Sequence, residues 1–330
     1  MAARKILVGL IAGAAVLAAL AVAAFVLRPD RAIRVATGFV AHNLCSKTFV
    51  SGLDPESIFA ETTDRAGIRL LRWALNYHLD RRRQTADASL AGLLGSHAVF
   101  HEGLGCVLRH GSDEPYVLKS DIAALKTPKT PPLLGEIAGP VPVEPADPAL
   151  KAVLDHAFDE PAAPPFRRTK AVVVVHQGRV IAERYADGIG VDTPLLGFSM
   201  TKSVVNALIG ILTQQGLVTP SMPGPIAEWR TPFDPRREIE VEHLMRMTSG
   251  LALDETNSGF DPSSRMLYLH NDMAGFAVKA ALVAPPGTRW AYSSPPRCLW
   301  RRSSATPSAA RSRRWLSHGA SCSIRWGCVT

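Results

Sequence analysis

Cysteine is scarce in this sequence. The chain has 5 cysteines in 330 residues, and only Cys45 and Cys106 precede residue 295. Two cysteines form at most one bridge, which excludes a disulfide-rich scaffold for the main part of the chain. Their spacing is compatible with one disulfide and equally with two separate buried thiols. The chain also has no internal repeat, which excludes a repeat array.

Acidic residues are absent from residues 295–330, which contain seven arginines but no Asp, Glu or Lys. The formal net charge of the whole chain is +8, so the rest of the chain carries only +1. The basic character therefore belongs to the tail. Its aromatic and basic residues show no groove-reading or base-stacking pattern, and we expect no nucleic-acid partner.

An apolar content of 47% with 20% charged residues is that of a globular chain. Before the globular part, Arg4 and Lys5 precede an uncharged stretch of 22 residues, 6–27. A helix of that length spans a bilayer core of about 30 Å. We expect a retained membrane anchor with the bulk of the chain on the periplasmic or extracytoplasmic side. The alternative is a cleavable signal peptide, with residues 21–23 as the small-residue cleavage site.

The composition divides the chain into five segments. Ten prolines crowd residues 127–165 and indicate an extended linker interrupted by a short helix over 149–158. The expected segments are an anchor or signal (1–34), an N-terminal extension (35–126), a proline-rich linker (127–148), a partial catalytic domain (149–294) and an aberrant, disordered tail (295–330).

The extension offers two local patterns. Apolar residues at helical spacing predict an amphipathic helix over 68–79, with Arg81, Arg82 and Arg83 as its solvated end. His97 and His101, four residues apart, could face a metal from one side of a helix. Because no third ligand lies near them, we assign no metal site and no cofactor.

Two β-branched runs joined by Gln177-Gly178 predict a hairpin over 171–185, where an antiparallel sheet begins. A helix with an apolar stripe (Val204, Val205, Leu208, Ile211, Leu212) follows and ends at Gly216. Ser199 lies at the start of this helix, which we expect to be buried. Lys202 projects from the same face one turn later.

Serine needs a base within hydrogen-bond reach to act as a nucleophile. An apolar setting favours the neutral amine of Lys202, which can accept the serine proton. The N-terminus of the helix adds backbone donors where an oxyanion would form. The alternative is a helix-capping serine followed by a surface lysine, and the local pattern alone leaves both open.

Four motifs in order resemble the family of class C β-lactamases, esterases and nylon-oligomer (aminohexanoate-dimer) hydrolases. They are the hairpin, Ser199-Met200-Thr201-Lys202 opening a helix, residues 241–251 ending in Thr-Ser-Gly-Leu, and residues 286–294 ending in Tyr-Ser-Ser. The resemblance covers about 149–294. It implies an α/β (α+β) fold with a β-lactamase-like antiparallel sheet and a helical subdomain.

The resemblance also implies functional roles. Ser199 would be acylated by a small-molecule amide or ester substrate, Lys202 would assist, and Tyr292 would relay protons. Ser294 would be the third residue of the Tyr-x-Ser motif and bind substrate. A serine where β-lactamases commonly have asparagine favours the nylon-oligomer and esterase-like members. Without the resemblance, the position of Tyr292 beside Trp290 after a Pro-Gly turn indicates a packing role in the core. His243 is then expected to be a structural residue.

After Ser294 the pattern departs from the family, whose later strand with a Lys-Thr-Gly or His-x-Gly motif is absent. If the codons of residues 316–327 are read in the frame that starts at each third base, the codon that spans Trp326 and Gly327 must encode glycine. The same frame permits the segment Leu-Phe-Asp-Pro-Leu-Gly-Met. This segment resembles what this family places after its tyrosine motif. We therefore expect a frameshift, an incomplete sheet and impaired activity. The alternative function is a non-catalytic β-lactamase-like remnant that binds a ligand.

Overall fold

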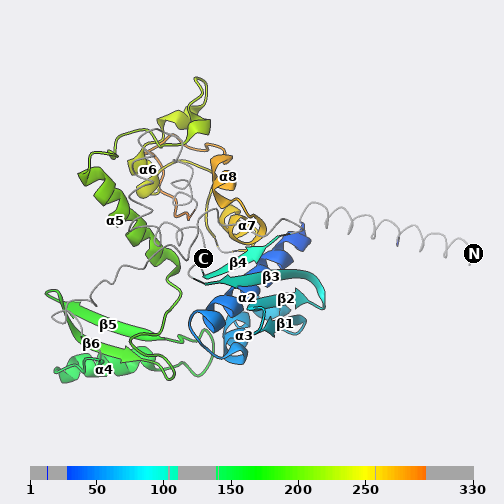
Figure 1. Ribbon diagram of the computed structural model, residues 1–330, viewed down its shortest axis with the longest axis vertical. Coiled ribbons are helices and arrows are strands. Elements are labelled where there is room, and N and C mark those ends of the chain that lie inside the picture. Colours follow the sequence, from blue (N-terminus) through cyan, green and yellow to red (C-terminus); the bar gives the residue numbers. More distant parts are fainter. Residues whose placement is uncertain are drawn as a thin grey trace, which may run out of the picture.

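A computed structural model describes residues 28–102, 105–110, 139, 141–256 and 258–294, together with the isolated Gly13. The N-terminal part of the described chain is a helix-on-sheet unit (Figure 1). Its sheet is antiparallel with the strand order β1-β2-β3-β4. The elements are α2 (Pro29–Phe49), α3 (Pro55–Thr63), η1 (Arg69–Leu71), β1 (Leu75–Asp80), β2 (Thr85–Leu90), β3 (Leu93–His101) and β4 (Gly105–Arg109).

The helix predicted over 68–79 is wrong. Residues 69–71 form the short 3-10 helix η1, and Leu75–Asp80 is strand β1, in which Leu75 pairs with Leu90. Leu75 is buried while Asn76 is exposed, so the alternation of a half-buried strand prevails over the helical spacing. The three arginines 81–83 therefore lie in the exposed turn between β1 and β2, not at a helix end.

Helix α2 packs on one face of this sheet because small residues allow a close approach. Ala86, Ala88 and Ala98 of the sheet are almost fully buried in one core with Val40 and Leu44 of α2. Tyr268, from a helix more than 200 residues further along the chain, belongs to the same core. A Cβ on Gly38 of α2 would lie 3.2 Å from the Cβ of Tyr268. The extension and the later helices thus share one packed interior.

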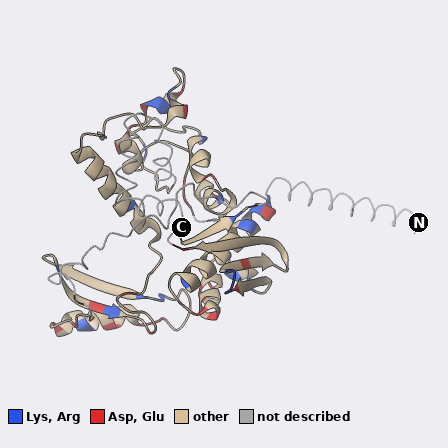
Figure 2. Ribbon diagram, in the orientation of Figure 1, with Lys and Arg blue, Asp and Glu red and all other residues tan. Residues whose placement is uncertain are grey.

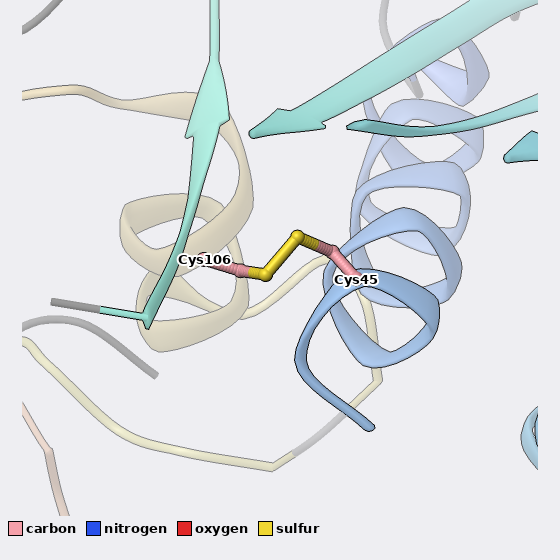
Figure 3. The surroundings of a disulfide bond; sticks show 2 residues. All are labelled: Cys45 and Cys106. Carbon is pink, nitrogen blue, oxygen red and sulfur yellow. A yellow bond between two sulfur atoms is a disulfide. The ribbon is translucent and has the colours of Figure 1, made fainter. Parts of the chain in front are cut away.

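Cys45 and Cys106 form a disulfide, with 6.0 Å between their Cα atoms. Figure 3 shows the bridge joining α2 to β4. It ties the helix to the edge strand of the sheet on which it packs.

No helix within the described residues is long and apolar enough to span a bilayer. The membrane anchor expected over 6–27 lies outside the described residues, apart from Gly13. The same holds for most of the proline-rich linker and for the tail from residue 295.

The predicted hairpin and the short helix before it are both present. Strand β5 (Ala171–His176) pairs antiparallel with β6 (Arg179–Tyr185), and α4 (Pro148–Phe158) lies along them (Figure 1). Leu154 of α4 is 1% exposed, and Arg184 of β6 forms an ion pair with Asp155. Within the part of the chain that the structure describes, this sheet has two strands.

A second core holds the short helices that follow. Trp229 is 1% exposed and donates a hydrogen bond of 3.0 Å from its indole nitrogen to the carbonyl of Val278. Arg236 pairs with Asp234 and also donates to the carbonyls of Val278 and Ala280. The elements are η2 (Phe198–Met200), α5 (Thr201–Gln214), η3 (Ala227–Trp229), η4 (Pro235–Glu238), α6 (Val241–Met245), α7 (Pro262–Leu269) and α8 (Met273–Val278). The chain is thus a mixed α/β protein with antiparallel sheets.

Candidate active site

Ser199 lies in a tight turn that leads into a helix. It is the middle residue of η2, and α5 begins two residues later at Thr201. Phe198, directly before it, has a φ of 40°, a left-handed conformation that non-glycine residues rarely adopt. The hydroxyl of Thr201 donates a hydrogen bond of 2.7 Å to the carbonyl of Phe198 and holds this turn. Strained backbone of this kind is often found at functional sites.

The expected burial of α5 is wrong. Ile209 is its only fully buried residue, while Val204 is 46% exposed. The apolar stripe has the predicted periodicity, but among the described residues no element other than η2 makes an extended contact with α5. Ser199 and Lys202 themselves are half-buried.

Tyr292 comes to Ser199 on a segment that is docked against residues 247–250. The amide of Gly287 donates to the carbonyl of Thr248 at 2.8 Å, and the amide of Ala291 donates to the carbonyl of Met247 at 3.0 Å. Gly250 makes this docking sterically feasible, because a Cβ there would lie 2.0 Å from the carbonyl oxygen of Ala284. We did not identify Met247 and Gly250 as positioning residues from the sequence, although the Thr-Ser-Gly motif marks their place.

Four side chains that the sequence analysis singled out meet at one point. The ammonium of Lys202 donates hydrogen bonds of 3.1 Å to Ser199 Oγ, to the phenol oxygen of Tyr292 and to Ser294 Oγ. The phenol of Tyr292 donates a hydrogen bond of 2.5 Å to Ser199 Oγ. All three donors of the lysine are therefore used within this cluster.

The charge of Lys202 acts directly on Tyr292. Partial burial alone would raise the pKa of Tyr292, but its hydrogen bonds with Ser199 and Lys202 and the positive charge of Lys202 outweigh burial. The net result is a pKa below the usual value for tyrosine. Ser294 is 3% exposed, so it forms the closed end of the cluster, whereas Tyr292, at 37% exposure, borders solvent.

A cavity of about 410 Å³ adjoins the amine of Lys202. Its apolar wall comes from Ile209 of α5 and from Leu244 and Met247, while Ser293 lies at the same rim. This volume is in the range of small-molecule pockets in proteins. The cluster of Ser199, Lys202, Tyr292 and Ser294 therefore lies beside a cavity that could hold an apolar group.

The histidines of the sequence do not join this cluster. His97 and His101 lie on strand β3, not on a helix, and His97 Nδ1 is 2.6 Å from a carboxylate oxygen of Asp87. Among the described residues there is no group of three side chains that could hold a metal ion. His243 has a structural position, because its Nδ1 accepts a hydrogen bond from the amide of Glu240 at the start of α6.

Comparison with known proteins gives one family match. Residues 155–295 match the model of the beta-lactamase family. A search of curated proteins finds no match to the chain. Solved structures that match include a protein described as a 6-aminohexanoate-dimer hydrolase from Bacillus anthracis, with 19% identity and a TM-score of 0.36 over 56% of this chain and 53% of that chain. The chain thus spans about half the length of that structure, and we transfer no substrate from it.

Proposed function

We propose that this chain is a serine hydrolase that cleaves an amide or ester bond through an acyl-enzyme on Ser199, and the match of residues 155–295 to the beta-lactamase family model supports this proposal. The observation that carries the proposal is the contact of Ser199 Oγ with the phenol of Tyr292 at 2.5 Å and the amine of Lys202 at 3.1 Å. A hydroxyl held between a proton acceptor and a positive charge is the arrangement that activates a serine.

The phenol of Tyr292 donates to Ser199 in the structure, so the proposed proton path begins when Tyr292 ionises. With three donors engaged, Lys202 as an ammonium stabilises the phenolate of Tyr292, which accepts the proton of Ser199 as Oγ bonds to the substrate carbonyl carbon. Tyr292 then returns that proton to the leaving amine or alcohol when the scissile bond breaks. In the second half of the reaction a water molecule attacks the acyl carbon and passes its proton to Tyr292. The bond between Oγ and the acyl carbon then breaks, Tyr292 returns the proton to Oγ, and the carboxylic acid product leaves.

The cavity beside Lys202 would accept an apolar part of the substrate. Val205, Ile209, Leu244, Met245 and Met247 line it together with Ser203, Asn206 and Arg246, so the proposed substrate is a small amide or ester with an apolar substituent next to a polar group. Ser294 would keep the lysine oriented toward Ser199, in addition to the substrate contact expected from the resemblance.

We also propose that the reaction takes place outside the cytoplasm, with residues 6–27 as the anchor. The disulfide between Cys45 and Cys106 supports this location, because such bridges persist in oxidising compartments. Fractionation of cells that produce the full chain tests the proposal. Recovery in the membrane fraction with Cys45 and Cys106 oxidised is expected, and recovery in the cytosol with both thiols free would refute it.

The exposed face of α5 favours a second candidate, a ligand-binding remnant without turnover. Val204 in that face is 46% exposed, and the adjoining hairpin sheet has two strands among the described residues. We expect weak activity from the chain for the same reason, since a poorly supported helix holds a nucleophile less firmly.

Labelling of the purified full chain with a fluorophosphonate probe separates the two candidates. Ser199→Ala should abolish labelling, whereas Ser221→Ala, in the exposed turn that follows α5, should label like the parent. Mass spectrometry should place the adduct on Ser199. Equal labelling of Ser199→Ala and the parent, or no labelling of the folded parent, would refute the hydrolase proposal.

A further inference from the structure

A second and larger cavity lies on the N-terminal unit, away from Ser199. It has a volume of about 720 Å³ and is bordered by the first turns of α2, by β2 and β3, by the residues after β4 and by the end of α7. None of the four residues of the proposed active site lines it. This volume is large enough for a small-molecule ligand.

The lining of this cavity is strongly basic. Five arginines and two aspartates border it, and the arginines are Arg28, Arg31, Arg34, Arg109 and Arg265. Both carboxylates are already engaged, because Asp30 pairs with Arg28 at 2.9 Å and Asp87 contacts His97 at 2.6 Å. Arg28 is paired with Asp30, and Arg109 also makes an interaction of its own. The candidate ligand donors are therefore Arg31, Arg34 and Arg265.

Among the described residues, no carboxylate forms an ion pair with any of these three arginines. The Nε atom of Arg265 is buried and has no hydrogen-bond partner there, although its guanidinium lies over the ring of Phe276. Because this nitrogen is closed to solvent, Arg265 borders the cavity through its other atoms. Arg34 makes one weak bond, of 3.4 Å, to the carbonyl of Gly95.

The positive charges act on a neighbouring histidine at the rim of the cavity. Burial is the first cause that lowers the pKa of His270, and the charges of Arg265, Arg31 and Lys279 lower it further. Arg31 of α2 and Arg265 of α7 therefore act on the same side chain, although 234 residues separate them in the sequence. Two distant segments converge to build one positive surface.

We propose that this cavity binds a phosphate-bearing ligand, held by Arg31, Arg34 and Arg265. Guanidinium groups bind the oxygens of phosphate in paired, charge-assisted hydrogen bonds, which suits a site with several arginines and engaged carboxylates. The ligand is a free phosphate ester or the headgroup of an anionic phospholipid. The second source is attractive because the lining begins at Arg28, directly after the apolar stretch that ends at Leu27. In Figure 2 basic residues lie at the N-terminal end of α2, and Lys47 lies in its last turn at the other end.

Calorimetric titration of the detergent-solubilised full chain with inorganic phosphate and with glycerol 3-phosphate tests the free ligand. Flotation with phosphatidylglycerol vesicles, compared with phosphatidylcholine vesicles, tests the lipid headgroup. Arg31→Gln and Arg34→Gln should each weaken binding roughly tenfold, the effect of one lost charge-assisted hydrogen bond. Arg246→Gln, which removes an exposed arginine paired with Glu242, is the matched control and should bind like the parent.

Arg265 is tested separately because it packs on Phe276 and its loss could disturb α7. Arg265→Lys keeps the charge and most of the stem but removes the fork of donors, and we expect weaker phosphate binding with an unchanged circular dichroism spectrum. The proposal is supported if the parent binds in the calorimetric or the flotation experiment and the variants bind more weakly. The experiment in which binding is seen identifies the ligand as a free phosphate ester or a lipid headgroup. Absence of binding in both arms, or equal binding by the parent, Arg31→Gln and Arg34→Gln, overturns it.

Discussion

The phenol of Tyr292 donates a hydrogen bond of 2.5 Å to Ser199 Oγ, although the two residues lie 93 positions apart in the sequence. The contact depends on the docking of residues 287–291 against residues 247–248 through two backbone hydrogen bonds. The cluster therefore forms only when both segments have folded. Activity should consequently be sensitive to changes in the docking surface as well as in the four side chains.

Tyr292→Phe removes the phenol oxygen and keeps the ring. Acylation of Ser199 should slow by roughly 10²–10⁴-fold, the usual contribution of a positioned acid or base. The rate of fluorophosphonate labelling measures this effect. Trp290→Phe is a suitable control, because Trp290 is 65% exposed and its ring centre lies 6.5 Å from that of Tyr292. A variant without the phenol that labels at the parental rate would exclude the proton relay.

The pH dependence of acylation should follow the ionisation of Tyr292. In the proposed mechanism the phenolate accepts the proton, so the rate should rise with pH, and a pKa below the usual 10.0 should shift this rise to lower pH. The tyrosinate absorbance of the parent minus that of Tyr292→Phe reports the ionisation directly. Lys202→Met removes a hydrogen bond and a positive charge from the phenolate, so the same ionisation should move to higher pH. Identical titration curves for the parent and Lys202→Met would contradict this electrostatic role.

Gly250→Ala should impair both folding and acylation. The new Cβ would lie 2.0 Å from the carbonyl oxygen of Ala284, and the residue has a φ of +73°. The backbone strain alone costs about 1–3 kcal/mol, and relief of the clash must displace the segment that carries Tyr292. Gly216→Ala is a matched control, since Gly216 has a φ of +68° with open space around the new Cβ.

Urea unfolding and the labelling rate should separate the two glycine variants. Gly216→Ala should lose only the backbone strain, about 1–3 kcal/mol, and should label normally. Equal effects of the two substitutions would show that the contact with Ala284 is unimportant.

Loss of the disulfide should destabilise the chain. Replacing both Cys45 and Cys106 by serine opens a loop with a sequence separation of 61 residues, and chain entropy predicts a loss of roughly 4 kcal/mol in the free energy of unfolding. Urea unfolding with and without dithiothreitol measures the loss. The reductant should shift the parent and leave the double variant unchanged, whereas an unshifted parent would show that the bridge adds no stability.

The four side chains of the candidate cluster could be singled out from the sequence because each lies in a short motif. Ser199 and Lys202 have the spacing of one helical turn, and Tyr292 and Ser294 lie in a motif whose role came from the family resemblance. Spacing alone did not reveal that Met247 accepts the backbone bond that positions Tyr292, because such a contact joins distant segments. The exposure of Val204 was likewise unpredictable, since periodicity identifies an apolar face but not its partner.

The hairpin over 171–185 and the helix over 148–158 were predictable from local signals, namely a Gln-Gly turn between β-branched runs and a proline after Asp147. The four-stranded sheet of the N-terminal unit was not. Its buried positions are largely alanines, such as Ala86 and Ala98, which give a weak signal for strands. Leu75 and Leu79 have the helical spacing by coincidence, and the pairing with β2 makes this segment a strand.

The place of Tyr268 in the N-terminal core has a practical consequence for anyone who trims this protein to a minimal fragment. A fragment that starts near residue 149 keeps the whole family-matching region, yet it removes the surface of α2 against which Tyr268 packs at Gly38. Helix α7 would then present a large aromatic side chain to water. The smallest fragment that can stand alone should therefore begin before α2, well upstream of the boundary that sequence similarity suggests.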